Sequence, residues 1–341
     1  MNRELLTQSY DFELPQDRIA THPASPRDHA KLLVYNRATD TLSHARFYEL
    51  EHYLPKNTAL IFNNTKVIKA RLFGIKESGG KVEILINKPL NATELHAFIR
   101  GRVKVGMKII IDDELSALVK ELLDDGSRVI EFLACEKVLR FEELLPYLDR
   151  LGHIPLPPYI QREDNEEDVK EYQSVFAKHE GAVAAPTASL HFSDEQHKRI
   201  CQNFSHAYIT LHVGSGTFKP VEAQTITDHP MHSEYYEISP EAKKFLDSDQ
   251  PILCVGTTAT RTVEYYARHQ DETSGEANLF LHPNNRPLRV NHLLTNFHLP
   301  KSTLIMLVAS FVGLDKTLEL YHEAIKNDYR FYSYGDAMLI L

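Results

Sequence analysis

Residues 70–134 read ARLFGIKESGGKVEILINKPLNATELHAFIRGRVKVGMKIIIDDELSALVKELLDDGSRVIEFLA. Six short strand-like runs follow one another here: ARLFGIK (70–76), GKVEILIN (80–87), TELHAFIR (93–100), MKIIID (107–112), LSALVKEL (115–122) and SRVIEFLA (127–134). Turn-forming Gly, Asn and Asp residues separate them, and no helix fits among them. Six short strands at regular spacing predict a small antiparallel β-barrel, which we place at residues 68–150.

The sequence on either side of the predicted barrel has a different pattern. Strand-like runs precede it at residues 31–36, 41–47 and 58–63. After residue 151, strands alternate with helices; the strands are at 207–213, 251–255 and 338–341, and the helices at 194–204, 259–269, 301–311 and 315–327. This alternation predicts an α/β domain with a mixed or parallel sheet. The simplest architecture is a discontinuous α/β domain, residues 1–67 plus 151–341, interrupted by the inserted six-stranded barrel.

Composition narrows the class of protein. A chain of 341 residues, 43% of them hydrophobic, suits two globular domains. Its formal charge of −9 means that a polyanion would need locally clustered cations. The three cysteines form no C-x-x-C pattern, which disfavours a disulfide scaffold or a structural zinc site. The N-terminus lacks the apolar core of a signal peptide, and the longest apolar run, residues 303–313, is too short to span a bilayer. We therefore expect a soluble cytoplasmic protein.

Three histidines are candidates for acid–base chemistry. His191, His212 and His298 each lie between large apolar residues and beside turn-forming residues. Imidazole titrates near neutral pH and can donate or remove a proton in catalysis. For each histidine taken alone, a buried ring bonded to a backbone carbonyl remains the alternative.

The run CVGTTATR (254–261) predicts a turn from a strand into a helix. Backbone N–H groups at a helix start bind anions, the hydroxyls of Thr257 and Thr258 add donors, and Arg261 could grip a carboxylate through two hydrogen bonds. Plain capping of the helix by either threonine is the alternative. The GSG run at 214–216 is a weak nucleotide-loop signal, because Pro220 follows where a helix would have to start.

Two further groups of polar residues have open interpretations. His229, His232 and Glu234 resemble a metal site in spacing, but no other cluster completes the ligand set, so we predict no metal. Two basic clusters could contact a phosphate backbone or simply form charged strand faces. Their members are Lys66, Lys69, Arg71 and Lys76 in the first, and Arg100, Arg102, Lys104 and Lys108 in the second.

These motifs coincide, in order, with those of a known family. The matching runs include NNTKVIKARLFG (63–74), GAVAAPTASLHF (181–192), LHVGSGTFKPV (211–221), GTTATRT (256–262), TNFHLPKSTLIMLVASFVG (295–313) and YRFYSYGDAMLI (329–340). Nearly the whole chain resembles the S-adenosylmethionine:tRNA ribosyltransferase-isomerases of queuosine biosynthesis. It departs from the family pattern at Ser189, where Gly is usual, at Ser215, where Leu is common, and at Asn284, where Gly is usual.

The resemblance implies an α/β domain interrupted by a β-barrel, and a transferase that modifies tRNA. The ribosyl part of S-adenosylmethionine would be transferred to 7-aminomethyl-7-deazaguanine (preQ1) at the tRNA wobble position and isomerised. Epoxyqueuosine-tRNA, adenine and methionine would be the products. The cosubstrate is consumed, so no resident cofactor is expected. The family also implies a monomer that acts on tRNA and needs no membrane.

The resemblance also suggests roles for single residues. His212 and His298 are the first candidates for proton transfer, with His191 third. The candidate substrate-binding residues are Arg27, Asp28, Asn64, Thr187, Gly214, Gly216, Thr257, Thr258, Arg261, Asn296 and Asp336. The candidate tRNA-binding residues are Lys66, Lys69, Arg71, Arg100, Arg102 and Lys104. Two alternatives remain open: an RNA methyltransferase using the same cosubstrate, and a non-catalytic RNA-binding protein.

Overall fold

The structure is a computed structural model that describes residues 2–214, 216 and 221–341. The chain divides into two compact units. The first contains residues 1–65, 173–179 and 185–341, and the second contains residues 66–172 and 180–184. The domain boundaries expected from the sequence, 1–67 plus 151–341 around 68–150, stay a prediction.

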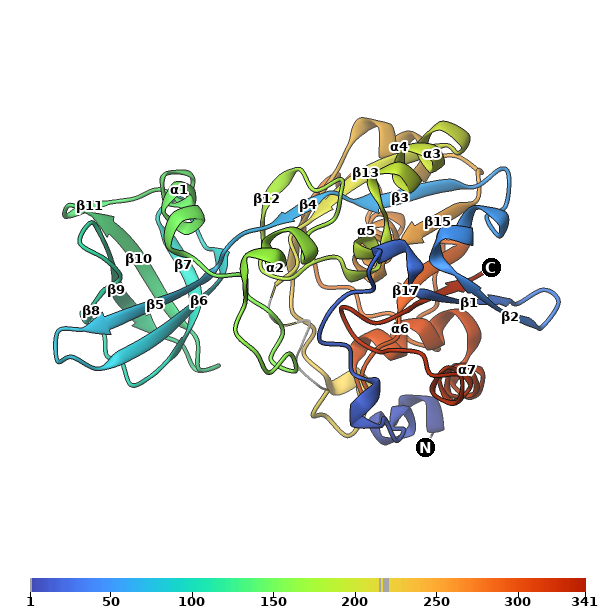
Figure 1. The fold of residues 1–341 in the computed structure, drawn as a ribbon, viewed down its shortest axis with the longest axis horizontal. Helices are drawn as coiled ribbons and strands as arrows, with labels where there is room; N and C mark the ends of the chain where they lie inside the picture. The colour runs from blue at the N-terminus through green and yellow to red at the C-terminus, as the bar shows by residue number, and fades with distance from the viewer. Residues whose placement is uncertain (1, 215, 217–220) are drawn as a thin grey trace. The chain divides into compact units, whose positions relative to one another are not determined.

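The first unit is built on a nine-stranded mixed sheet (Figure 1). In spatial order its strands are β16 (Ser274–Ala277), β14 (Glu234–Ile238), β13 (His206–Leu211), β3 (Ala59–Asn63), β15 (Ile252–Val255), β17 (His292–Asn296), β18 (Ala337–Ile340), β1 (Lys31–Asn36) and β2 (Thr41–Arg46). The strands β13, β3, β15 and β17 run parallel to one another. Strand β18 is antiparallel to β17 and parallel to β1. The carboxyl ends of the four parallel strands therefore share one edge with the amino ends of β18 and β1, and we call this the carboxyl edge.

Burial on both faces explains why the central strands read as continuous apolar runs. Every residue of β3, β15 and β18 is buried. One face packs against the 3-10 helix η5 (Phe47–His52) and against α3, where Phe47 and Ile200 are fully buried. The helices of this unit are α3 (Asp194–Asn203), α4 (Pro240–Leu246), α5 (Thr257–Arg268), α6 (Thr303–Val312) and α7 (Leu314–Lys326). The apolar run at 303–313 is the buried helix α6, and no helix in the described part of the chain is long and apolar enough to cross a membrane.

The second unit contains the predicted barrel. Its strands are β5 (Arg71–Lys76), β6 (Lys81–Pro89), β7 (Glu94–Arg100), β8 (Lys108–Ile110), β9 (Leu115–Leu122) and β10 (Arg128–Ala134). The sheet closes because β10 pairs with both β7 and β9. All six predicted strand-like runs form strands, so the expected fold class, a mixed α/β sheet with a six-stranded antiparallel barrel, is confirmed.

Several elements were not anticipated. Helix α1 (Phe141–Leu151) follows the barrel strands, and its Leu144 and Leu148 complete the apolar core of the barrel. The others are β4 (Thr65–Val67), β11 (Lys137–Val138), β12 (His179–Ala182), β14, β16 and β17, whereas α2 (Glu166–Glu171) lies where the acidic segment 162–171 was expected to form a solvated loop and the start of a helix. Strands β4 and β12 pair in a separate two-stranded sheet.

Candidate active site at the carboxyl edge of the sheet

Sheet topology brings distant candidate residues to the carboxyl edge. His212 follows β13, Asn64 follows β3, Thr257 and Thr258 begin the helix after β15, and Asn296 ends β17. In open α/β sheets, ligands bind in the crevice outside the carboxyl ends of the strands. The described part of this edge therefore brings together several of the residues that the sequence motifs indicated as candidates.

His212 is held by a threonine hydroxyl. Its Nδ1 lies 2.7 Å from Oγ1 of Thr65, and its ring stacks on Tyr235 with 6.2 Å between centroids. Burial, assisted by the nearby His179, lowers the pKa of His212 to about 4. At neutral pH this imidazole is therefore uncharged, and one of its nitrogens carries a lone pair.

Asn63, the last residue of β3, forms hydrogen bonds to three neighbouring segments close to this histidine. Its Nδ2 donates to the carbonyl of Leu211 at 3.0 Å and to the Thr258 hydroxyl at 3.1 Å. Its Oδ1 accepts from the backbone amides of Leu211 and Thr65 at 3.0 and 3.2 Å. Asn63 is fully buried, and this saturated amide fixes β13, β3 and α5 against one another. It lies inside a family motif but was not singled out, whereas its neighbour Asn64 was; Oδ1 of Asn64 accepts from Thr210 at 2.7 Å.

The predicted strand-to-helix turn is present. Gly256 precedes α5 with φ of 93° and ψ of 157°, a backbone conformation that is nearly exclusive to glycine. Thr257 and Thr258 are buried in the first turn of α5. The N-cap position is Gly256, so no side chain caps the start of this helix. Ala188 in η6 (Thr187–His191) comes close to Gly256, so this turn packs against a second candidate segment.

Arg261 is engaged in a buried ion pair. Its Nη1 donates to Oε2 of Glu234 at 2.6 Å, and both side chains are almost inaccessible to solvent. Burial by itself would raise the pKa of Glu234, but the charges of Arg261 and His232 outweigh it and lower the pKa to about 2. The other carboxylate oxygen of Glu234 accepts from the amide of Gly214 at 3.0 Å. Arg261 thus grips a protein carboxylate, and any contact with a substrate stays a prediction.

Gly214 is therefore anchored by Glu234, and Gly216 lies against His232. A Cβ built on Gly216 would lie 2.9 Å from the imidazole of His232, so a glycine is needed for that close approach. His232 Nε2 lies 3.6 Å from the same Glu234 carboxylate. For Glu234, capping or contact with substrate was preferred to a metal site, and its role as the anchor of Gly214 was missed. Ser215, a departure from the family pattern, lies outside the described residues.

His191 and Asn296 form a second buried pair. His191 Nε2 lies 3.0 Å from Oδ1 of Asn296, whose Nδ2 donates to the carbonyls of Tyr332 and Ser333 at 2.9 and 3.2 Å. Because the amide nitrogen faces two carbonyls, Oδ1 must be the acceptor and His191 carries its proton on Nε2. Burial lowers the pKa of His191 to about 4, against the opposing effects of Asn296 and Asp336.

His298 is also buried, and it has the lowest pKa of the three candidates. Its Nε2 lies 2.8 Å from the Thr295 hydroxyl, and its backbone amide donates to the Tyr321 hydroxyl at 3.1 Å. Burial lowers its pKa to about 3. The three histidines are thus all neutral near pH 7, and none is connected to another by a hydrogen bond among the described residues.

The remaining candidates of the first unit lie in turns. Asp28 accepts from the Ser193 hydroxyl at 2.8 Å, Arg27 donates to the carbonyl of Gln173 at 3.2 Å, and Thr187 begins η6. Asp336 accepts the backbone amides of Lys31 at 2.8 Å and Arg330 at 2.7 Å. Ser189, the other described departure in this region, is fully buried, and its hydroxyl has no hydrogen-bond partner.

The basic candidates belong to the second unit and fall into two groups. Lys66 pairs with Glu180 at 2.7 Å, Lys69 donates to a backbone carbonyl, and Arg71 lies 3.3 Å from Glu83. The other three are exposed at one end of the barrel: Arg100 ends β7, and Arg102 and Lys104 lie in the loop before β8. Only this second group presents charges that an RNA backbone could reach without displacing a local partner.

Comparison with known proteins agrees with this arrangement. The family of queuosine biosynthesis proteins matches residues 7–340. The S-adenosylmethionine:tRNA ribosyltransferase-isomerase of Sulfurimonas denitrificans is 69% identical over 338 residues, and that of Aliarcobacter butzleri is 56% identical over 337 residues; each alignment covers 99% of both chains. The solved S-adenosylmethionine tRNA ribosyltransferase from Thermotoga maritima is 32% identical, with a TM-score of 0.54 over 98% of this chain and 100% of that one. The resemblance expected from the sequence is confirmed: the chain belongs to the queuosine biosynthesis family of S-adenosylmethionine:tRNA ribosyltransferase-isomerases.

Proposed function

We propose that this enzyme transfers the ribosyl group of S-adenosylmethionine to the aminomethyl group of preQ1 at the wobble position of tRNA and isomerises it. The products are epoxyqueuosine-tRNA, adenine and methionine. The observation that carries the proposal is the neutral imidazole of His212, held 2.7 Å from Thr65 at the carboxyl edge. It supplies the base that this reaction needs at the place where α/β sheets bind small molecules.

The chemistry begins with a proton on carbon. The positive sulfur of S-adenosylmethionine acidifies the adjacent C5′ hydrogen, and a neutral imidazole with a free lone pair can remove it. The Thr65 hydroxyl also lies 3.5 Å from the carbonyl of His179. A hydroxyl that donates to that carbonyl accepts from Nδ1 of His212, which leaves Nε2 as the base.

The other two histidines suit different tasks. With pKa values of about 3 and about 4, His298 and His191 carry no charge near neutral pH. They are therefore poor sources of a free proton but adequate neutral hydrogen-bond donors or acceptors. Departure of adenine is assisted by hydrogen bonding to its ring, and we assign that task to His298 first and His191 second.

The polar turns around these histidines are assigned to substrate binding. The first turn of α5, with Thr257 and Thr258, is assigned to the ribose or methionine end of the cosubstrate. Asn296 and Asp336 are assigned to the deazaguanine edge. The group transferred comes from the cosubstrate itself, so the reaction requires no resident cofactor. We further propose that the enzyme is cytoplasmic and works as a monomer. Light scattering tests the oligomeric state directly.

One assay tests the reaction against its rivals. The enzyme is incubated with S-adenosylmethionine and tRNA bearing preQ1, and the small molecules released are separated. Adenine and methionine in equal amounts are expected. S-adenosylhomocysteine would instead identify a methyltransferase, and no release with intact RNA binding would identify a non-catalytic RNA-binding protein. Unmodified tRNA is the control, because it lacks the attacking amine.

A further inference from the structure

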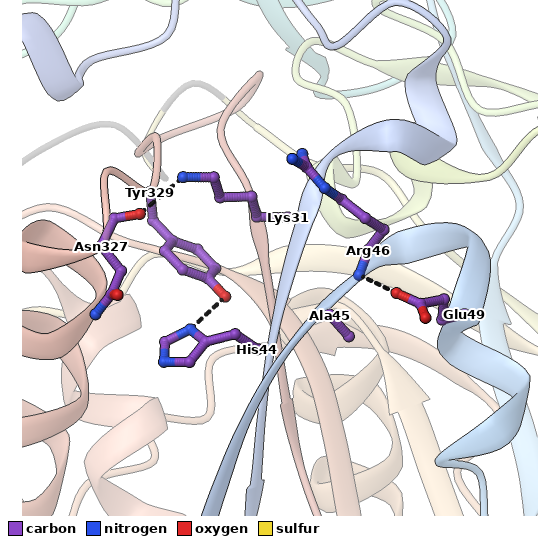
Figure 2. A pocket seen from close by; sticks show the side chains of 7 residues that line it. All are labelled: Lys31, His44, Ala45, Arg46, Glu49, Asn327 and Tyr329. Carbon is purple, nitrogen blue, oxygen red and sulfur yellow. Dashed lines mark hydrogen bonds between the residues drawn. The ribbon is translucent and has the colours of Figure 1, made fainter.

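Two pockets open at the carboxyl edge, beside β1 and β2, and Asp336 is the one lining residue that has been given a role above. Their volumes are about 290 and about 410 Å³, and both are lined by Lys31 and Arg46. Figure 2 shows the smaller pocket, with Lys31 extended beside the ring of Tyr329 and with Arg46 among the lining side chains. Arg330 and His29 line the larger pocket. We call these two spaces, which share Lys31 and Arg46 as lining residues, the Arg46 pocket.

The cations of the Arg46 pocket are held mainly by neutral groups. Nζ of Lys31 donates to the carbonyls of Asn327 at 2.7 Å and Asp328 at 2.9 Å. Nη1 of Arg46 donates to the carbonyl of His29 at 3.0 Å, and the Arg46 side chain is exposed. Backbone carbonyls orient these side chains without neutralising them, so their remaining N–H groups can bind an anion.

The carboxylates that line the same pocket are already occupied. Glu49 accepts the backbone amide of Arg46 at 2.7 Å, as the dashed line in Figure 2 shows. Asp336 accepts two backbone amides and lies 3.6 Å from the guanidinium of Arg330. Asp328 pairs with Arg18. The cations of the pocket therefore keep N–H groups that can bind a ligand, whereas its carboxylates are already bound to donors. This difference favours an anionic ligand.

An exposed aromatic ring adjoins the pocket. Tyr48 is 45% exposed, and its ring lies 5.2 Å from that of His29, which lines the larger space. An arginine and an exposed tyrosine two residues apart are a pairing that single-stranded nucleic acid uses, with the phosphate on the cation and the base on the ring. A small carboxylate ligand would have no use for the aromatic ring.

We infer that the Arg46 pocket binds a nucleotide of the anticodon loop next to the modified one, with its phosphate against Arg46 and Lys31 and its base on Tyr48. The pocket adjoins the candidate active site, because Asp336 lines it and the next residue, Ala337, pairs with Asn296, the partner of His191. The inference rests on the proposed function, since it takes tRNA as the substrate. It adds a contact to the RNA made by the α/β unit itself, separate from the cations of the barrel.

Binding of a labelled anticodon stem-loop RNA, with and without preQ1, tests this inference across a range of salt concentrations. Arg46→Ala should weaken binding about tenfold. It should also reduce the slope of log affinity against log salt by about 0.7, the value for one phosphate on a single strand. Arg46→Lys should restore the slope. Tyr48→Ala should weaken binding at least about fivefold with the slope unchanged, because a lost stacking contact releases no counterion.

Arg3→Ala is the matched control, since Arg3 is an exposed arginine of the same unit that pairs only with the exposed Asp315 among its described contacts. It should bind RNA like the wild type. Unchanged affinity and slope in Arg46→Ala would overturn the inference. So would a raised KM for S-adenosylmethionine with unchanged RNA affinity, which would assign the pocket to the methionyl carboxylate. If the wild type binds RNA but releases no adenine, the proposed reaction fails while the pocket assignment can still hold.

Discussion

Oγ1 of Thr65 lies 2.7 Å from Nδ1 of His212, although the two residues are 147 positions apart in the chain. One residue, Asn64, separates Thr65 from the end of β3, and His212 directly follows β13. The parallel pairing of these two strands brings both ends to one place. The hydroxyl fixes the plane of the imidazole and favours one tautomer, so in the proposed mechanism Thr65 acts through His212 as a positioning residue.

His212→Ala should lower kcat about 100-fold or more, as loss of a general base does. Thr65→Val, which removes the hydroxyl and keeps the shape, should lower kcat about tenfold with little change in the KM for S-adenosylmethionine, and Thr65→Ser should recover most of it. Steady-state release of adenine measures all three. His322→Ala, on the exposed face of α7, is the control. Near-normal turnover in His212→Ala would remove this histidine from the mechanism.

The buried pair of Glu234 and Arg261 makes a prediction about stability. Glu234→Gln leaves the guanidinium of Arg261 buried without a counter-charge and should lower the free energy of unfolding by about 3–5 kcal/mol. Glu234→Met combined with Arg261→Met should recover most of that loss, because two apolar side chains need no partner. Urea unfolding measures both. Asp315→Asn, at the exposed pair with Arg3, should cost less than about 1 kcal/mol. Equal losses at the two pairs would contradict the argument.

Local sequence patterns predicted the elements whose signal is local. The six barrel strands, β1 and the buried helix α6 follow from apolar periodicity and from turn residues within short windows. Helix α1 escaped because Pro146 lies inside it, and only the spacing of Leu144 and Leu148 reveals its apolar face. The strand β14 alternates buried and exposed residues beside a Pro- and His-rich segment that carries no clear boundary.

The candidate site divides in the same way. Single histidines beside turns could be recognised from the sequence because their flanking residues are apolar. Their partners could not, because strand pairing selects them: Thr65 for His212, and Asn296 for His191 across 105 positions. Arg261 was expected to bind the substrate, and only the folded chain shows that it binds the carboxylate of Glu234. Contacts made by tertiary structure leave no local pattern to read.

The exposed cations at one end of the barrel make a prediction about RNA affinity. If Arg100, Arg102 and Lys104 contact phosphates, replacing all three by Ala should weaken tRNA binding and reduce the slope of log affinity against log salt by about 2–3. Replacing Lys56, Lys198 and Lys244 by Ala removes the same charge from exposed positions of the other unit. That control should leave the slope close to the wild-type value. Equal effects of the two triple variants would mean that only net charge matters.

His298 makes a prediction about stability against pH. Its pKa is about 3 in the folded chain, below the ordinary value of 6.5. Between these two pH values, His298 is therefore protonated in the unfolded chain but not in the folded chain. Stability must therefore fall as the pH drops below about 6.5, by about 2 kcal/mol between pH 7 and pH 5 for this residue alone. Buried His191 adds a loss of the same sign.

Part of this dependence of stability on pH should disappear when His298 is replaced. His298→Gln keeps a polar side chain beside the Thr295 hydroxyl but has no proton to gain. The variant should be less stable than the wild type near pH 7 because the packing changes, yet its stability should fall less steeply with acidification. Urea unfolding at several pH values gives both slopes, and His322→Gln is the matched control. Parallel curves for wild type and His298→Gln would show that His298 is protonated equally in both states, and its burial would then not govern its charge.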